Sequence, residues 1–459
     1  MSANDLHALI QTAAGAVPNP SEPNLLRALY PYAGPPRLEF APHPPGPALP
    51  ADFYITDTTF RDGQQARTPY TPEQITTLFD FLHRLSGPEG VIRQAEFFLY
   101  GPQDRRAVEA CLSRGYRYPQ VTAWIRAVAK DFELVRAAGI AETGILTSCS
   151  DYHIYLKLGL DRAKAMRQYL DVVRAALEAG VRPRCHFEDV TRADIHGFVV
   201  PFAQALMALG EAAGIPVRIR LCDTMGYGVP WAEAALPRSV PRLVRTLIEE
   251  AGVPGAQLEW HGHNDFHKGE ANAQAAWLYG CAAVNGTLLG FGERTGNTPI
   301  EGLIFDYLAL RPEAAIDTRV VTEIARYFES ELGYQVPPMT PFVGRQFNVT
   351  AAGIHADGLI KNEEIYNIFD TEALLDRPLG VNVTDKAGAA GVAFWVNRAL
   401  GLKGEARLDK RHPGIAAMTE WVREQYAGGR TTSLSEAEMA AAAARFLPEF
   451  AAQDAAPVR

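Results

Sequence analysis

The sequence predicts an α/β fold, a (βα)8 TIM barrel followed by a small, mostly helical C-terminal region. From residue 53 to about residue 315, short apolar or β-branched runs alternate with helix-like stretches, and eight such units occur. Strict alternation of strand and helix implies a parallel sheet, and eight units without a sheet edge imply that the sheet closes. Distinctive polar residues follow most of the strands, which is where barrels of this class build their active sites.

The expected strands are residues 53–57, 94–100, 118–124, 143–148, 182–188, 217–222, 257–263 and 282–288. Amphipathic runs lie between them, and RAKAMRQYLDVVRAALEAG ends at Gly180, a residue suited to a helix C-cap. We expect residues 1–50 to form a Pro-rich arm that starts with a short helix and then wraps on a neighbour or stays mobile. Residues 51–315 would form the catalytic barrel, and residues 316–459 the C-terminal subdomains.

Composition and charge exclude several classes of protein. The apolar fraction of 47% and the charged fraction of 21% are ordinary for a globular chain. The net charge of −9 disfavours nucleic acid and anionic membranes as partners. No apolar run approaches the roughly 20 residues of a membrane span, and the N-terminus lacks the pattern of a signal peptide. The five cysteines are scattered and show no CxxC spacing, which favours free thiols in a reducing cytoplasm.

A candidate metal site combines the strand that carries His261 and His263 with the segment that carries Asp62. Residues i and i+2 of a strand point to the same face, so the two imidazoles can converge on one ion. Asp62 follows the first strand, which closes the barrel near the seventh, and can supply an oxygen. A mixed N/O shell suits Mn, Co, Zn or Mg and leaves positions open for a bidentate 2-oxo acid. The alternative is a pair of polar histidines that binds no metal.

Other polar residues near the strand ends are less specific. Arg61 either forms a surface ion pair or, inside a barrel mouth, pairs with Glu188 or stabilises developing negative charge. Glu188 and its neighbour Asp189 could equally form an acidic pair at a helix N-terminus. The glycine-rich GFGERTGN lacks the pattern of a phosphate loop, although Asn297 at its end could add an amide oxygen to the metal.

Seven motifs together resemble the DRE-TIM metallolyase superfamily, and specifically its Claisen-condensing branch. They are DTTFRDGQQ, TSCSDYH, FEDVTRAD, CDTMGYGVP, HGHND, GFGERTGN and GIHADG, and the resemblance covers about residues 53–400. The branch includes 2-isopropylmalate, homocitrate, citramalate and Re-face citrate synthases. Three further segments are most similar to the Re-face citrate synthases: DGQQAR, FHK and NVTAAGIHADGLIKNEEIYNIFD.

The resemblance implies roles for individual residues. Asp62, His261 and His263 match the metal ligands, and Asn297 matches a position often assigned as a fourth. Arg61 matches the arginine that polarises the 2-oxo group. The positions that match substrate-pocket and catalytic residues in the barrel are Gln65, Glu96, Thr224 and Glu188.

His355 and Tyr366 match helper residues of the family's small subdomain. In relatives this subdomain reaches over the barrel of a neighbouring subunit, which implies that the C-terminal region contributes to the active site and that the protein is a homodimer. Relatives regulated by feedback carry a further C-terminal domain. Only roughly 60 residues follow the end of the resemblance near residue 400, so we expect no such domain here.

The sequence departs from the family pattern at three places. It has Gln64 where relatives have Glu, His186 where many have Ser, and His267-Lys268 after HGHND. These departures argue against 2-isopropylmalate as the product. Polar candidates for binding a second substrate carboxylate are numerous and favour a dicarboxylate such as oxaloacetate: Arg67, Arg126, His153, His186 and Lys268.

The expected reaction is a metal-dependent condensation of acetyl-CoA with a 2-oxo acid, preferably oxaloacetate, to give citrate and CoA. Mn²⁺ is the expected metal, with Co²⁺, Mg²⁺ or Zn²⁺ as alternatives. His355 and Glu188, with Tyr366, are the candidates for the base that deprotonates the acetyl group. The alternative products are 2-isopropylmalate, homocitrate and citramalate.

Three other activities fit the residues less well. An acyl-CoA lyase such as 3-hydroxy-3-methylglutaryl-CoA lyase would need a loop cysteine that FGERTGN lacks. A carboxyltransferase would need a modified lysine at a strand end. A non-catalytic scaffold on the same fold would not need Asp62, His261 and His263.

Overall fold

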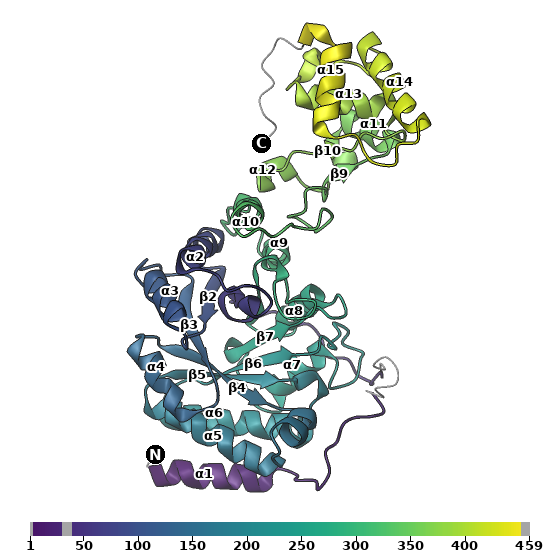
Figure 1. Cartoon of the computed structure of the whole chain (residues 1–459). Coiled ribbons are helices and arrows are strands. Elements are labelled where there is room, and N and C mark those ends of the chain that lie inside the picture. The colour runs from purple at the N-terminus through teal and green to yellow at the C-terminus, as the bar shows by residue number, and fades with distance from the viewer. Residues whose placement is uncertain (1–2, 30–38, 451–459) are drawn as a thin grey trace. The chain divides into compact units, whose positions relative to one another are not determined.

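The computed structural model describes residues 3–29 and 39–450, and the chain divides into two compact units, Met1–Asp317 and Thr318–Arg459 (Figure 1). The first unit contains a closed barrel in which eight parallel strands pair in sequence order. The strands are β1 (Tyr54–Asp57), β2 (Ile92–Phe97), β3 (Gln120–Ile125), β4 (Glu142–Ser148), β5 (Arg182–Glu188), β6 (Arg218–Asp223), β7 (Leu258–Gly262) and β8 (Ala283–Gly286). The pairing of β8 with β1 closes the barrel and confirms the predicted fold class.

A helix follows each strand and covers the outside of the barrel. These helices are α2 (Pro72–Ser86), α3 (Pro102–Leu112), α4 (Phe132–Ala137), α5 (Arg162–Glu178), α6 (Val200–Ala213), α7 (Val240–Glu249), α8 (Gly269–Leu278) and α9 (Ile300–Leu310). Local signals set their starts: Thr71 forms a capping box with Gln74, and Asp161 accepts a hydrogen bond from the Lys164 amide.

The strands place apolar side chains outward and polar side chains inward. On β5, Phe187 points outward and stacks on Phe202 of α6 with ring centroids 5.0 Å apart. The alternate positions Arg184 and His186 point into the barrel, where their exposures are 0% and 1%. Apolar packing therefore lies between the sheet and the helices, whereas the interior of the barrel is ionic.

One helical stretch, Ile195–Ala213, is long and apolar enough to span a membrane by length and composition, with a mean hydropathy of 1.3 over its window. It includes α6, and the sequence-based expectation of no such run overlooked it. Phe202, Leu206 and Leu209 of this stretch are fully buried against the barrel. Its apolar character is therefore that of a helix in a packed outer layer.

The described parts of the N-terminal segment lie along the barrel of their own chain. Helix α1 (Ala3–Ala16) packs on α5 and α6. The Asn24 amide donates to Asp151, and Phe40 forms an isolated bridge with Ala234. Residues 30–38, which include the start of the Pro-rich stretch, lie outside the described residues.

The second unit is mostly helical. It contains α10 (Arg319–Ser330), α11 (Gly353–Lys361), α12 (Thr371–Leu375), α13 (Gly388–Ala399), α14 (Pro413–Ala427) and α15 (Glu436–Phe446). Two short parallel strands, β9 (Val349–Thr350) and β10 (Gly380–Val381), pair with each other. Its core lies between α13, α14 and α15, where Val396, Met418 and Met439 are buried.

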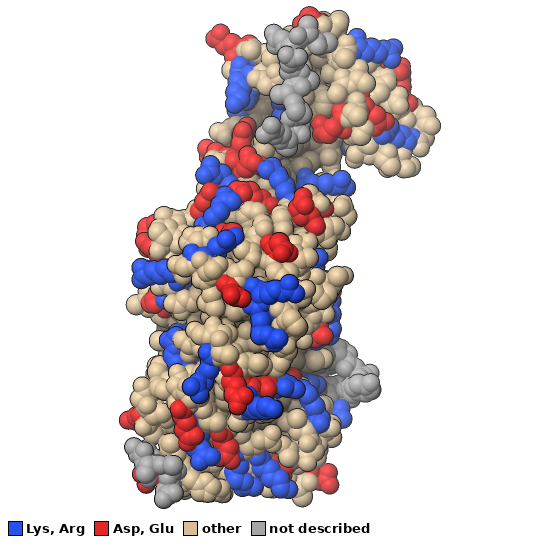
Figure 2. Space-filling view, turned by 60° about the vertical axis from the view of Figure 1, so that its left-hand side comes forward, with Lys and Arg blue, Asp and Glu red and all other residues tan. Residues whose placement is uncertain are grey.

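Basic and acidic side chains are interspersed over the face of the molecule that Figure 2 shows, and neither sign forms a continuous area there.

Candidate metal centre and active site

Asp62, His261 and His263 meet at the carboxyl end of the barrel. Asp62 lies in the turn Thr59–Gly63 directly after β1, His261 lies in β7, and His263 follows β7. One potential ligand atom from each residue lies within 4.8 Å of the others, and all three residues are buried. The Nε2 atoms of the two imidazoles are 3.4 Å apart, and His263 Nε2 is 3.9 Å from Asp62 Oδ2.

The turn that carries Asp62 is held by the strand that precedes it. The carboxylate of Asp57, the last residue of β1, accepts hydrogen bonds from the amide and the hydroxyl of Thr59. The Thr59 hydroxyl also accepts from the Leu288 amide, which ties the turn to the end of β8. Burial raises the pKa of Asp57 to about 7, against the effect of these hydrogen bonds.

Asn285 on β8 fixes the orientation of the His261 ring. The Asn285 amide nitrogen donates to the carbonyl and the hydroxyl of Thr56, so its oxygen faces His261 Nδ1 at 2.7 Å. Because that oxygen can only accept, Nδ1 carries the proton and Nε2 presents its lone pair to Asp62 and His263. This is the tautomer that a metal ligand needs.

Asp62 is ionised and oriented by its neighbours. Burial raises its pKa, but the Arg61 guanidinium and the two imidazoles outweigh burial and bring the pKa to about 2. Arg61 Nη1 donates to Asp62 Oδ1 at 2.6 Å, and the Asn297 amide nitrogen donates to Asp62 Oδ2 at 2.6 Å. Burial first, and then the neighbouring His263, lower the pKa of His261 to about 4, so His261 is neutral at pH 7.

These donors fit a divalent cation. Two neutral imidazole nitrogens and one carboxylate converge on a small buried space, and such a mixed set suits a transition metal. Two buried atoms beside it, His263 Nδ1 and Asn297 Oδ1, have no hydrogen-bond partner among the described residues. Asn297 turns its nitrogen toward Asp62, so in this arrangement it positions Asp62, and a half-turn of its amide would present the oxygen.

The glycines of GFGERTGN let the loop fold tightly around Asn297. A Cβ on Gly292 would lie 2.2 Å from the Asn297 amide nitrogen, and a Cβ on Gly296, where φ is +86°, would lie 2.0 Å from the Gly290 carbonyl oxygen. A side chain at either position would therefore displace the loop. Arg294 fastens the loop from outside through two contacts to Asp265, at 2.8 and 3.1 Å.

Glu188 belongs to a second polar cluster, and the expected pair with Arg61 is wrong. Glu188 accepts hydrogen bonds from Ser148, from His153 Nδ1 at 2.9 Å and from Lys157 Nζ at 3.1 Å. Burial raises the pKa of Glu188, but these neighbours outweigh burial and lower it to about 2. Arg61 instead contacts Asp62 and Glu96 and lies over the Trp124 ring at 4.8 Å.

Next to the candidate metal ligands, the barrel interior holds a network of buried charges. Glu96 lies 3.0 Å from both Arg184 and Arg220, and Arg220 contacts Glu259 at 2.9 Å. Glu259 accepts from the Thr56 hydroxyl, which also accepts from Asn285. A continuous set of polar contacts therefore leads from Arg61 through Glu96, Arg220, Glu259, Thr56 and Asn285 to His261.

His186 lies in this network. Its Nε2 is 3.4 Å from a Glu96 carboxylate oxygen, and burial, followed by the charge of Arg220, lowers its pKa to about 3. Gly144 makes room for the ring, because a Cβ there would lie 2.6 Å from His186 Nε2. His186 is therefore a neutral interior side chain below the metal ligands.

The remaining predicted site residues are placed in different surroundings. Gln65 is exposed. The Thr224 hydroxyl accepts from the Asp189 amide at 2.8 Å, and Arg126 is held by Asp131 through two contacts at 3.1 and 3.2 Å. His355 and Tyr366 belong to the second unit, where their ring centroids are 4.4 Å apart.

Sequence reasoning missed Asn285, Arg220 and Glu259, although a signal for Arg220 and Glu259 was present. On β5, Arg182, Arg184, His186 and Glu188 occupy every second position. Glu259 and His261 on β7 show the same spacing, as do Arg218 and Arg220 on β6. Since side chains two apart share a face, this alternation marks a polar inward face next to the metal ligands.

The chain is similar to known proteins over most of its length. The family model described as HMGL-like matches residues 52–327. The citrate (Re)-synthase of Syntrophus aciditrophicus is 55% identical over 94% of this chain and 69% of its own length. The citrate (Re)-synthase of Clostridium kluyveri is 49% identical over 94% of this chain and 95% of its own length. In fold, the chain resembles hydroxymethylglutaryl-CoA lyase from Pseudomonas aeruginosa, with a TM-score of 0.52 and 20% identity over 62% of this chain and 95% of the lyase. The chain therefore belongs to the HMGL-like family.

Proposed function

We propose that this chain condenses acetyl-CoA with oxaloacetate to give citrate and CoA in a metal-dependent reaction. One observation carries the proposal: Asp62, His261 and His263 converge, buried, at the catalytic end of the barrel. The identity of 55% and 49% to two citrate (Re)-synthases favours oxaloacetate over other 2-oxo acids.

Asp62, His261 and His263 would hold the divalent cation, with Asn297 as the fourth ligand. The bound cation supplies Lewis-acid polarisation of the 2-oxo acid oxygens. Arg61 is fixed between Asp62, Glu96 and the Trp124 ring, so its charge is oriented before the substrate arrives. It stabilises the negative charge that develops on the carbonyl oxygen when the new bond forms. Thr224, Gln65 and Glu96 surround the 2-oxo acid in this proposal.

The reaction removes a proton from the acetyl methyl group and joins this carbon to the oxaloacetate carbonyl carbon. The carbonyl oxygen takes up a proton, and water then cleaves the thioester to release CoA. With a pKa of about 2, Glu188 is a weak base, so we assign it the positioning of His153. His355, paired with Tyr366, is then the candidate base, and His153, His186 and Arg126 are the candidates for the second carboxylate of oxaloacetate.

We propose Mn²⁺ as the metal and cytoplasm as the location. Two imidazoles and a carboxylate suit Mn²⁺, Co²⁺ or Zn²⁺ better than Mg²⁺, which prefers oxygen ligands. All five cysteines are free, as expected in a reducing compartment. Equilibrium dialysis against each metal followed by activity measurement tests the metal assignment.

We propose a homodimer in which the second unit, residues 316–459 in the sequence-based division, completes the active site. The segment around His355 and Tyr366 exposes several large apolar side chains, with exposures of 74% for Ile354, 52% for Ile365 and 96% for Ile368. Apolar side chains grouped in this way indicate a surface that is covered in the assembled protein.

A CoA-release assay with acetyl-CoA, Mn²⁺ and a panel of 2-oxo acids tests the function. The panel contains oxaloacetate, 2-oxoglutarate, 2-oxoisovalerate, pyruvate and glyoxylate. We expect oxaloacetate to be preferred, with activity lost on chelation and in His263→Ala. The control His196→Ala changes an exposed histidine paired with Glu250 and should retain activity. Preference for another 2-oxo acid would overturn the assignment of oxaloacetate as the substrate. If no acid leads to release of CoA, the proposed condensation is itself overturned.

Mixing two inactive variants tests the shared site. His263→Ala and His355→Ala, refolded or co-expressed together, should regain about a quarter of wild-type activity, because mixed dimers contain one intact site. A mixture that stays inactive, although each variant alone is dimeric by light scattering, would contradict a site shared between subunits.

A further inference from the structure

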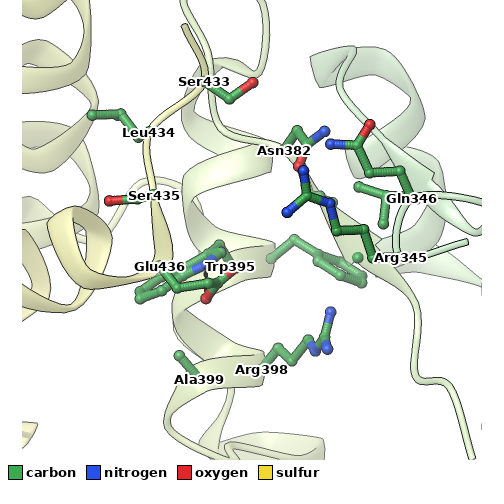
Figure 3. Close-up of a pocket in the computed structure, with 14 residues that line it drawn as sticks. Arg345, Gln346, Asn382, Trp395, Arg398, Ala399, Ser433, Leu434, Ser435 and Glu436 are labelled. Atoms are coloured by element: carbon green, nitrogen blue, oxygen red, sulfur yellow. Dashed lines mark hydrogen bonds between the residues drawn. The ribbon is translucent and has the colours of Figure 1, made fainter. Parts of the chain in front are cut away.

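The second unit contains a cavity that none of the proposed catalytic or metal-binding residues lines. It has a volume of about 550 Å³, within the range of roughly 300–1,000 Å³ typical of small-molecule sites. Its walls come from β9, β10, α13 and residues 433–436 at the start of α15 (Figure 3). All of these elements belong to one compact unit, so the cavity is formed within it.

Two arginines give one side of the cavity its charge. Arg345, which precedes β9, is exposed and forms no hydrogen bond or ion pair with any described residue. Arg398 of α13 is anchored, because its Nη1 donates to the Leu379 carbonyl oxygen at 2.6 Å. Gly380 permits this approach, since a Cβ there would lie 3.2 Å from Arg398 Nη1 and 2.8 Å from Val349. The guanidinium of Arg398 is therefore held in place, and that of Arg345 can contact a ligand.

The one acidic side chain that lines the cavity is engaged elsewhere. Glu436 accepts a hydrogen bond from Trp395 Nε1 at 3.0 Å. In Figure 3, Glu436 lies beside Trp395, away from the ends of Arg345 and Arg398. The arginine side of the cavity is thus left with uncompensated positive charge, which suits an anion carrying more than one negative charge.

Neutral side chains complete the lining. The amides of Gln346 and Asn382 form no side-chain hydrogen bond with described residues, and each can both donate and accept. Phe394 of α13 is partly buried and offers an aromatic surface next to Val349 and Val381. The cavity therefore combines a cationic part, free amides and an aromatic, apolar part.

We propose that this cavity binds the adenine nucleotide class of ligand. The phosphate of the ligand would lie between Arg345 and Arg398. The adenine base would pack against Phe394, and the polar edge of the base would face the amides of Gln346 and Asn382. Two sources of this chemistry are available: the nucleotide end of CoA, which carries a 3′-phosphate, and a free nucleotide that acts as an effector.

Calorimetric titration of the full chain with adenosine 3′,5′-bisphosphate, AMP, citrate and inorganic phosphate tests the proposal. We expect binding of at least one nucleotide, weakened at least about tenfold by Arg345→Gln, since loss of a charge-assisted contact has effects of this order. Arg345 has no hydrogen-bond or ion-pair partner among the described residues, so we expect this variant to keep the fold. Arg398→Gln should act in the same direction, and Phe394→Leu should weaken nucleotides but not phosphate. The matched control Arg423→Gln removes a surface arginine that pairs with Glu420 and should bind normally.

The outcomes separate the sources. Binding of the bisphosphate but not AMP assigns the cavity to CoA, and binding of both assigns it to free nucleotides. No nucleotide binding at millimolar concentration, binding of citrate or phosphate alone, or binding that is unchanged in Arg345→Gln and Arg398→Gln overturns the proposal. His263→Ala should still bind, so failure here is distinguishable from failure of the proposed reaction.

Discussion

At the scale of single residues, the proposed metal ligands depend on neighbouring side chains that hold them in position. Asn285 holds His261 in one tautomer because Thr56 fixes which end of its amide faces the imidazole. Asn297 and Arg61 each hold one oxygen of the Asp62 carboxylate. Such supporting contacts tune the affinity of a metal site nearly as much as the ligands do.

Replacing Asn285 by leucine should weaken metal binding about 10- to 100-fold, because His261 would lose the acceptor that keeps its proton on Nδ1. Titration of the metal-free protein with Mn²⁺, followed by calorimetry, measures this change directly. Asn397→Leu is the matched control: it removes another buried asparagine, which bonds Leu408 in the second unit, and it should lower stability without changing metal affinity. Equal metal affinities in wild type and Asn285→Leu would show that the tautomer is fixed by other contacts.

The same scale shows what the sequence could predict of the site. The spacing of His261 and His263 and the position of Asp62 after the first strand sufficed to predict their convergence. The contacts of Glu188 were harder to predict, because its partners His153 and Lys157 lie on the segment after the neighbouring strand. Only the folded barrel brings them within 2.9 and 3.1 Å of Glu188. The role of Asn285 depends on hydrogen bonds to Thr56 across strands, which no local pattern encodes.

At the scale of elements, the loop after β8 rests on a buried acid of α9. Glu301 is 6% exposed and accepts from the amide of Leu289, a residue with a φ of +55°. Burial raises the pKa of Glu301 from 4.5 to about 7, more than its backbone hydrogen bonds lower it. The carboxyl group that supports the loop is therefore protonated in the folded protein at a pH where it is ionised in the unfolded chain.

This shift predicts a pH dependence of stability. Because the pKa of Glu301 is higher in the folded protein than in the unfolded chain, its contribution to the free energy of unfolding is complete below about pH 4.5. This contribution is lost as the pH rises toward about 7, and the loss is ~3 kcal/mol at most. Glu301→Gln should therefore stabilise the protein at pH 8 and have little effect near pH 5, as measured by urea unfolding. Glu313→Gln, at a side chain that is 68% exposed, should change stability at neither pH. A destabilised Glu301→Gln at pH 8 would contradict this assignment.

Element boundaries follow the predicted pattern closely but not completely. The second strand was expected to reach residue 100, yet β2 ends at Phe97, because the following segment turns out of the sheet and Tyr100 donates to Asp131 beyond β3. Similarly, the third strand starts at Gln120 rather than residue 118. Apolar residues that continue past a strand end look like strand in the sequence, and only tertiary contacts reveal where pairing stops.

At the scale of the whole barrel, the interior is held by charge pairs instead of the branched apolar layers common in this fold. Arg184 and Arg220 are 0% and 1% exposed, and both contact Glu96 and Glu259. Arg184 also lies 3.4 Å from Glu142. The neighbouring arginines outweigh burial and lower the pKa of Glu259 to about 2, so this carboxylate is charged in the folded state. The fold class could be predicted from the alternation of strands and helices, whereas this interior requires knowledge of which strands become neighbours.

Removing one charged side chain of this network should lower the free energy of unfolding. Arg220→Met removes one of the two arginines that contact both Glu96 and Glu259, so that Arg184 alone faces them. Carboxylate charge that is left uncompensated in the interior in this way costs about 3–5 kcal/mol. Chemical denaturation measures the loss. The double variant Arg220→Met/Glu259→Leu, which removes charge of both signs, should recover part of it. If the double variant loses at least as much free energy of unfolding as the two single variants lose together, the two residues do not act as a pair.

The unbroken run of contacts from Arg61 to His261 has a consequence for how this enzyme scaffold can change over evolutionary time. In a barrel filled with aliphatic side chains, the interior residues at the bottom of the active-site pocket and the catalytic residues can be substituted independently of one another. Here they share members, since Glu96 contacts both the interior arginines and Arg61. A new substrate preference that alters charge at the pocket floor therefore requires a compensating change several strands away, which restricts the mutational paths open to relatives with this interior.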